Sequence, residues 1–279
     1  MIEFEKLQRD PVSRRAFLQR MSAAGLGVAA ISLLNGCGGG GSSNNNSGGG
    51  QFPIRALPGT NDNVKVLNYA LTLEILEADL YRQALNYASG FPLTRELSAA
   101  GDYSLQVSSG GVNAAAGFAY LRDFAFVEAA HRDFLTVTIQ TLNETPVVRN
   151  AKGYQFASVP ANNLRAILEG ILPLEETGVR AYLGAAPFFV NFNTDLTKTL
   201  IQAAVGIYST EARHSAAIQY ILGKDSGPNG SEPGVPTNSR VTLRGVGALP
   251  YSDKGQGDTF EYFSTPNQVV NAIQPLIVK

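Results

Sequence analysis

The sequence predicts an all-α fold, a four-helix bundle with long crossover connections and an irregular C-terminal tail. Four segments repeat apolar residues at three- and four-residue spacings, the period of one helix face. Each segment is long enough to run the length of a bundle, and no strand-rich run or βαβ alternation lies between them. The segments cover residues 61–89, 112–143, 161–186 and 193–223.

Capping residues and one internal proline indicate where the expected helices begin, end or bend. Asp62 begins the first helix, with Asn or Asp near its start as a cap. Inside the third helix, Pro173 predicts a kink or a break because proline lacks an amide hydrogen. Gly223 closes the fourth helix, where glycine is typical of a C-cap. The bundle is therefore expected over residues 62–223.

The connections differ in length and composition. Residues 90–111 and 143–160 are long enough to cross a bundle end or to run its length. Beyond the fourth helix the chain is rich in Gly, Pro, Ser and Asn, which predicts an irregular extension over residues 224–279. The last part of this extension, residues 265–278, has the pattern of a short helix that docks back on the bundle.

The first 36 residues have the features of an export signal. Arg14 and Arg15 precede a weakly hydrophobic run that is too short to span a bilayer as a permanent helix. Paired arginines before such a run resemble a twin-arginine signal. The alternative is an ordinary secretory leader. The twin-arginine route, as generally understood, carries folded proteins that often hold a metal already, so we expect an exported protein of the cell envelope.

The single cysteine lies at the end of this signal. The sequence "LLNGC" resembles a bacterial lipoprotein box in which Cys37 is lipidated. The alternative is a free thiol beyond a conventional cleavage site. The following Gly, Ser and Asn residues cannot pack, so residues 37–61 are expected to be a lipid-attachment site and a flexible linker. The predicted partner is a membrane, reached through an N-terminal lipid anchor.

Composition excludes several other classes. With 22 Lys and Arg against 23 Asp and Glu, and with no basic stripe, nucleic acid is not an expected partner. One cysteine excludes an internal disulfide framework and any cysteine-rich zinc or iron–sulfur site. No rubredoxin-like group of four cysteines is present, which disfavours a self-sufficient rubrerythrin-like peroxidase, and the sequence does not indicate an electron donor.

The strongest motif is the position of the two histidines. His131 lies three residues after Glu128, and His214 lies three residues after Glu211. The spacing i, i+3 places a carboxylate and an imidazole on one helix face, where both can bind one first-row metal ion. One such pair is weak evidence, but the only two histidines both fit the pattern specified for di-metal bundles.

The other two helices should then each contribute one inward glutamate. An internal repeat selects them, because Leu-Glu followed by Tyr seven residues later occurs in both helices. Seven residues drift only about 20° around a helix, so each Glu–Tyr pair shares a face. The favoured ligands are Glu74 and Glu175, and the alternatives are Glu77 and Glu176. The paired tyrosines are Tyr81 and Tyr182.

Along the chain the pattern reads Glu, Glu-x-x-His, Glu, Glu-x-x-His, with one contribution per helix. Together with "YALTLEILEADLY" and "EETGVRAYLGAA", this pattern resembles the ferritin-like superfamily over about residues 62–223, and in particular bacterial ferritin-like domain proteins and plant desiccation-related proteins. The resemblance implies two iron ions, or two manganese ions as the alternative. It also implies that Glu128 and Glu211 bridge, that the histidines and the remaining glutamates are terminal ligands, and that Tyr81 and Tyr182 hold opposing carboxylates in place.

Three functions are compatible with this pattern. The first is a redox-active di-iron protein that reacts with O₂ or peroxide and protects the envelope, with a dimanganese catalase-like activity as its variant. The second is iron binding or storage without turnover, although a lipid tether disfavours a closed shell and is compatible with a homodimer. The third is a structural or stress-protective bundle in which the metal staples the fold.

Overall fold

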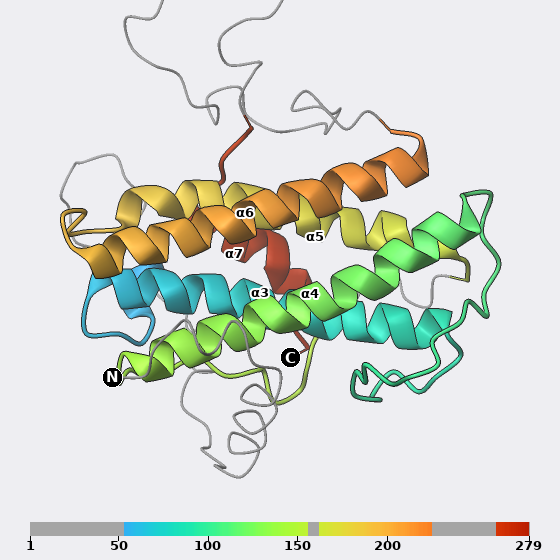
Figure 1. Ribbon diagram of the computed structural model, residues 1–279, viewed down its shortest axis with the longest axis horizontal. Coiled ribbons are helices and arrows are strands. Elements are labelled where there is room, and N and C mark those ends of the chain that lie inside the picture. The colour runs from blue at the N-terminus through green and yellow to red at the C-terminus, as the bar shows by residue number, and fades with distance from the viewer. Residues whose placement is uncertain (1–52, 156–161, 225–260, 279) are drawn as a thin grey trace, which may run out of the picture.

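The computed structural model describes residues 53–155, 162–224 and 261–278. The predicted signal peptide, Cys37 and most of the linker lie outside these residues. The described part is helical and contains no named strand, so the predicted all-α bundle is confirmed (Figure 1). Its α-helices are α3 (Asp62–Ala88), α4 (Ala114–Thr141), α5 (Leu164–Ala185), α6 (Asp195–Leu222) and α7 (Pro266–Ile273). The 3₁₀ turns are η2 (Pro53–Ala56), η3 (Ala186–Phe188) and η6 (Gln274–Leu276).

Side-chain caps fix the starts of the four long helices. In each case the cap accepts a hydrogen bond from the backbone N–H three residues later, which satisfies a donor that the helix itself leaves free. The caps are Asn61, Asn113, Asn163 and Thr194. At the other end of α6, Gly223 adopts φ 72°, the left-handed conformation expected of a glycine C-cap.

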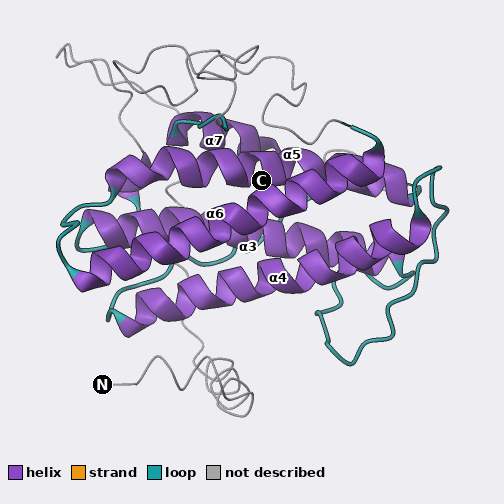
Figure 2. Cartoon of the chain, turned by 45° about the horizontal axis from the view of Figure 1, so that its top comes forward, coloured by secondary structure: helices purple, strands orange, loops and turns teal. Residues whose placement is uncertain are grey.

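The four long helices form two antiparallel pairs. α3 packs chiefly against α4, and α5 chiefly against α6; the pairs meet along α3–α5 and α4–α6 (Figures 1 and 2). In Figure 1, α3 and α6 run in one direction and α4 and α5 in the other. Because α4 and α5 run the same way, the chain between them must return along the whole bundle. The connection between α3 and α4 instead stays at one end, where Ser108 pairs with Asn163.

A kink or a break was predicted at Pro173, and no break occurs, because α5 continues through it. Proline removes one backbone donor and leaves a single carbonyl four residues earlier without its helical partner. Pro173 and Glu169 are both exposed, so water can satisfy that carbonyl. The helix therefore stays continuous and loses one backbone hydrogen bond, on its solvent-exposed side.

The end of the chain docks on the bundle through α7. This helix packs against α5 and η2 and buries Val269 and Ile273. At Gly184 a Cβ atom would lie 1.9 Å from the backbone oxygen of Ser264, so only glycine permits this close approach. Beyond α7, the N–H of Gln155 donates to the carbonyl of Leu276 at 2.9 Å, which ties the chain end to the long crossover.

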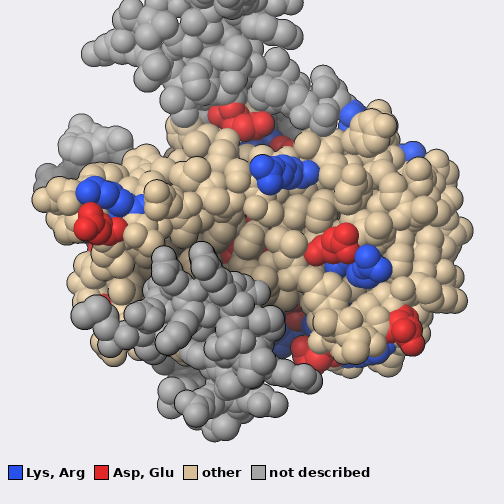
Figure 3. All heavy atoms as spheres, in the orientation of Figure 1, with Lys and Arg blue, Asp and Glu red and all other residues tan. Residues whose placement is uncertain are grey.

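The outer surface carries few charged residues. On the face in Figure 3, the Lys and Arg side chains are scattered, several of them beside acidic side chains, without a continuous basic area among the described residues. None of the described helices combines the length and apolar character that crossing a bilayer requires.

Candidate metal centre

The middle of the bundle contains a cluster of acidic and imidazole side chains. Its members form two groups of four, and the ligand atoms within each group lie within 4.8 Å of one another. The first group takes its distinct residues from α3 and α4, the second from α5 and α6, and both groups share Glu128 and Glu211. The six members are Glu74, Glu128, His131, Glu175, Glu211 and His214. The structure thus brings together all six residues that the sequence favoured.

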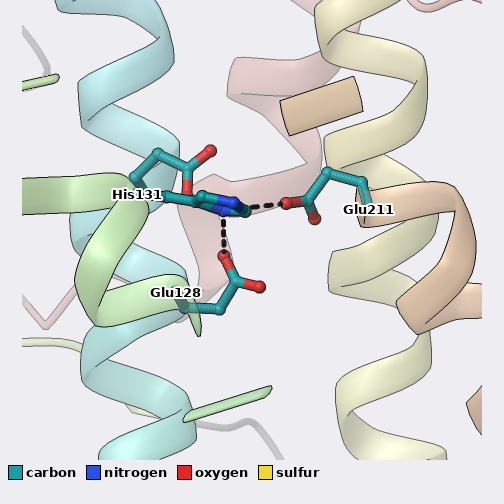
Figure 4. A group of neighbouring side chains, drawn as sticks. Glu128, His131 and Glu211 are labelled. Atoms are coloured by element: carbon teal, nitrogen blue, oxygen red, sulfur yellow. Dashed lines mark hydrogen bonds and ion pairs between the residues drawn. The ribbon is translucent and has the colours of Figure 1, made fainter. Parts of the chain in front are cut away.

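His131 faces three of these carboxylates. Its Nδ1 lies 3.2 Å from Glu128 Oε2, 3.4 Å from Glu74 Oε2 and 3.5 Å from Glu211 Oε1. Figure 4 shows Glu128 and Glu211 reaching toward the same ring from α4 and from α6. One nitrogen cannot donate to three oxygens with good geometry, so this convergence is typical of atoms that surround a cation.

His214 has the matching position on α6. Its Nδ1 lies 2.8 Å from Glu128 Oε1 and 3.5 Å from Glu175 Oε2. Glu128 therefore turns one oxygen toward each histidine. A carboxylate between two such groups has the position of a bridging ligand.

Many of these buried atoms have no hydrogen-bond partner among the described residues. The four glutamates are fully buried, and leaving a buried polar atom unpaired costs about 1–3 kcal/mol. The unpaired ligand atoms are Glu74 Oε2, Glu128 Oε1, Glu175 Oε2, both oxygens of Glu211, and His214 Nδ1. All point into the two groups, so their lone pairs suit metal ions. Carboxylate oxygens and imidazole nitrogens form a donor set that suits first-row transition metals.

Two tyrosine hydroxyls donate hydrogen bonds to glutamates of the cluster. Tyr182 Oη donates to Glu74 Oε1 at 2.6 Å, and Tyr81 Oη donates to Glu175 Oε1. Each bond runs between α3 and α5 and fixes the carboxylate on the other helix. Such partners orient metal ligands and occupy the oxygen that does not face the ion.

The comparison with known families agrees with this geometry. A family model described as "Ferritin-like domain" matches residues 62–224. The chain belongs to the ferritin-like domain family. No curated protein matches the sequence. The match confirms the resemblance to the ferritin-like superfamily, and in this ferritin-like domain the buried Glu/His cluster could hold metal ions.

The two alternative ligands lie in different surroundings. Glu176 is outside both groups: it accepts hydrogen bonds from Gln219 Nε2 at 2.7 Å, from Arg180 at 2.9 Å and from Ser215 Oγ. Glu77 is also outside both groups, but it is buried beside the cluster, and its Oε2 has no hydrogen-bond partner in the part of the chain that the structure describes. Glu176 is therefore satisfied by the protein, whereas Glu77 is not.

An aromatic stack covers one side of the cluster and was not identified from the sequence. The ring of Phe124 stacks on His214, with centroids 3.8 Å apart, and Tyr120 stacks on Phe124 at 5.4 Å. Phe124 lies one turn before Glu128 on α4, so only the packing of α4 on α6 brings it onto His214. The helical period places Phe124 near the inner face, but it gives no signal for this partner.

Burial and close packing of the carboxylates shift the pKa values of the glutamates in the ferritin-like domain. Burial raises the pKa of Glu74 to about 7, although the nearby His131 ring and the hydroxyl of Tyr182 oppose the shift. Burial and neighbouring carboxylates also raise the pKa of Glu211 and, more modestly, of Glu175. Burial would raise the pKa of Glu128 as well, but the two histidine rings beside its oxygens lower that pKa to about 2.

The carboxylates of the cluster also raise the pKa values of both histidines. Burial alone lowers a histidine pKa, but the carboxylates around His131 raise its pKa to about 12. For His214 the nearby carboxylates of Glu128 and Glu175 raise the pKa to about 9. Without a metal ion, the cluster therefore keeps protons on its histidines and on several of its acids.

Proposed function

We propose that this ferritin-like domain holds two transition-metal ions, iron in the first place, and reacts with O₂ or peroxide. The observation that carries the proposal is the set of buried carboxylate and imidazole atoms that face one another without hydrogen-bond partners. Unpaired buried charges are costly, and a pair of cations offsets that cost. Iron at these residues would supply electrons and open coordination positions for a small oxidant.

The residues have separate roles in this proposal. Glu128 and Glu211, common to both groups, would bridge the two ions, and His131 and His214 would each bind one. Tyr81 and Tyr182 keep the carboxylates of Glu175 and Glu74 turned inward. Phe124, stacked on His214, would hold that ring in place and shield that side of the centre from water.

The surroundings suit a small reactant. The His131 side chain is 15% exposed and that of His214 4%, so solvent reaches the cluster from the His131 side. A small apolar pocket of about 20 Å³ also lies between the helices, and Tyr182 is one of the residues that line it. It is large enough for about one water-sized molecule, and apolar cavities of this kind are compatible with O₂.

Elemental analysis of the folded, full-length chain tests the metal proposal. We expect about two transition-metal ions per chain. Glu128→Ala and His214→Ala should lose almost all of the metal, whereas Glu176→Gln should keep it because Glu176 lies outside both groups. A folded wild-type protein that binds no transition metal would contradict the proposal.

The reaction is tested separately on the metal-loaded protein. Iron together with O₂ or peroxide consumption supports the redox function. Manganese together with peroxide breakdown would indicate the dimanganese variant instead. Metal without consumption, and a large fall in the melting temperature on chelation, would indicate a structural or desiccation-related bundle, which is the alternative to the proposed reaction.

We also propose that the protein is exported to the cell envelope and anchored there by a lipid on Cys37. The support is the paired arginines Arg14 and Arg15 and the lipoprotein-like sequence around the only cysteine. Replacing both arginines with lysine should keep the protein in the cytoplasm, and Cys37→Ser should release it from the membrane fraction. Membrane association that is unchanged in Cys37→Ser would contradict the anchor.

A further inference from the structure

Glu77 is a buried carboxylate that the six-residue site does not use. It lies on α3, one turn beyond Glu74, and is only 3% exposed. Among the described residues, its Oε2 has no hydrogen-bond partner and no ion pair neutralises it. A buried glutamate with a purely structural role is normally satisfied by donors, as Glu176 is by Ser215, Gln219 and Arg180.

The internal repeat of the bundle shows that Glu77 has no equivalent carboxylate on α5. The shift along the chain that superposes Glu74 on Glu175, and Tyr81 on Tyr182, superposes Glu77 on Gly178. The third helix thus has no side chain where the first has a carboxylate. The repeat therefore does not extend to Glu77.

Gly178 also marks where the Glu77 carboxylate lies. A Cβ atom at Gly178 would lie 3.2 Å from Glu77 Oε1 and 2.8 Å from Glu211 Oε2. Both oxygens therefore lie against the same point on α5, and Glu211 belongs to both ligand groups. A side chain at residue 178 would push on both oxygens, so the glycine leaves room for one additional carboxylate next to a shared ligand.

The negative charge of Glu77 could balance part of the positive charge of the metal ions. The four glutamates of the two groups balance two divalent cations, while the two imidazoles add no charge when they bind a metal. A fifth carboxylate adds the negative charge that a more highly charged metal pair requires. In a buried site this compensation is effective, because the surrounding protein screens charge less than water does.

We propose that Glu77 is a seventh protein ligand of the metal centre, contributed by α3 alone because Gly178 leaves the equivalent position on α5 empty. This inference rests on the proposed function and deepens it. It makes the centre a site of five carboxylates and two histidines, in which the fifth carboxylate joins beside Glu211.

The test compares Glu77→Gln with Glu176→Gln in the full chain. Both replacements remove one acid and keep the size of the side chain, but only Glu77 lies unpaired beside the cluster. Each protein is titrated with Fe(II) in the absence of O₂, and the bound iron and its affinity are measured. The melting temperature of each metal-free form is measured as well.

We expect Glu77→Gln to weaken iron binding at least 10-fold, while its metal-free form melts at the wild-type temperature or higher, because an unpaired buried acid is gone. Glu176→Gln should show the opposite pattern, with unchanged iron affinity and a lower melting temperature. Glu77→Asp, which keeps the charge on a shorter side chain, should bind iron with an affinity between the wild type and Glu77→Gln.

Two outcomes would overturn the inference in different ways. If the wild type binds two iron ions and both Glu77 variants bind two with unchanged affinity, Glu77 is not a ligand, and the six-residue proposal stands. If the wild type binds no iron, the proposed function itself fails, and this inference fails with it.

Discussion

Removing the metal should reverse the way in which stability depends on pH. In the metal-free protein, burial raises the pKa of Glu74 to about 7, whereas a glutamate in an unfolded chain has a pKa of about 4.3. Below the unfolded value both states hold the proton and the stabilisation is fully present. As the pH rises, the unfolded chain releases its proton first, so stability falls until the folded state also ionises.

The size of this effect follows from the pKa values. In the interval from about pH 5.5 to 8.5, the folded state holds the Glu74 proton up to its pKa of about 7, whereas the unfolded chain has already released it. This difference extends over roughly 1.5 pH units, and each unit is worth about 1.4 kcal/mol. Glu74 alone should therefore lower the free energy of unfolding by about 2 kcal/mol across this interval. For a domain of this size, that corresponds to a fall in melting temperature of roughly 4–8 °C.

The histidines act in the same direction. The pKa of His214 rises to about 9 and that of His131 to about 12, because carboxylates surround both rings. Their contribution is also complete below the unfolded histidine pKa and is lost as the pH rises toward these values. Glu128, with its pKa lowered to about 2, acts in the opposite sense, but only under acid conditions below this interval.

The metal-loaded protein should behave in the opposite way. Metal ions bind the deprotonated ligands, so they compete with protons and bind more tightly as the pH rises. The assay is thermal unfolding followed by circular dichroism, with chelated and metal-loaded protein compared at several pH values. Glu74→Gln should reduce the slope of the chelated protein, and Glu176→Gln should preserve it. Parallel pH profiles for the loaded and the chelated protein would refute the reasoning.

Three further changes separate the parts of the site. Tyr182→Phe removes the donor to Glu74 and should weaken metal binding roughly 10- to 100-fold in a titration, with the helical circular dichroism signal retained. Phe124→Leu removes the ring stacked on His214 and should also weaken metal binding, and an unchanged affinity would show that the stack does not position the histidine. Asp79→Asn breaks the ion pairs of Asp79 with two arginines and should cost about 1–3 kcal/mol in denaturant unfolding, without any change in bound metal.

The bundle and the cluster could be predicted from sequence because both depend on local periodicity. The expected segment 193–223 became α6, Asp195–Leu222, and its C-cap is the predicted Gly223. The spacing between Glu128 and His131 puts both side chains on one face of any helix, whatever that helix packs against. The repeat also favoured Glu175 over Glu176, and the structure places Glu175 in the cluster and Glu176 outside it.

What depends on packing between helices could not be predicted. Nothing local to Phe124 indicates that it stacks on a histidine of α6. Asp79 had no assigned role, yet it is buried and binds Arg149 of the long crossover as well as Arg82 of its own helix. Of the kink or break expected at Pro173, the break does not occur, because the penalty depends on which face of the helix the proline occupies, and that face is set by the neighbouring helices.

The two halves of the centre are related by the repeat, but their surroundings differ. Phe124 lies four residues before Glu128 and covers His214, whereas the equivalent residue before Glu211 is Ile207, which offers no ring. The His131 side chain is also the more exposed of the two. Two ions in this centre would therefore have different surroundings, one closed by an aromatic stack and one nearer to solvent. The sequence repeat explains why the ligands could be found, and its exceptions indicate that a small reactant would approach from the side of His131.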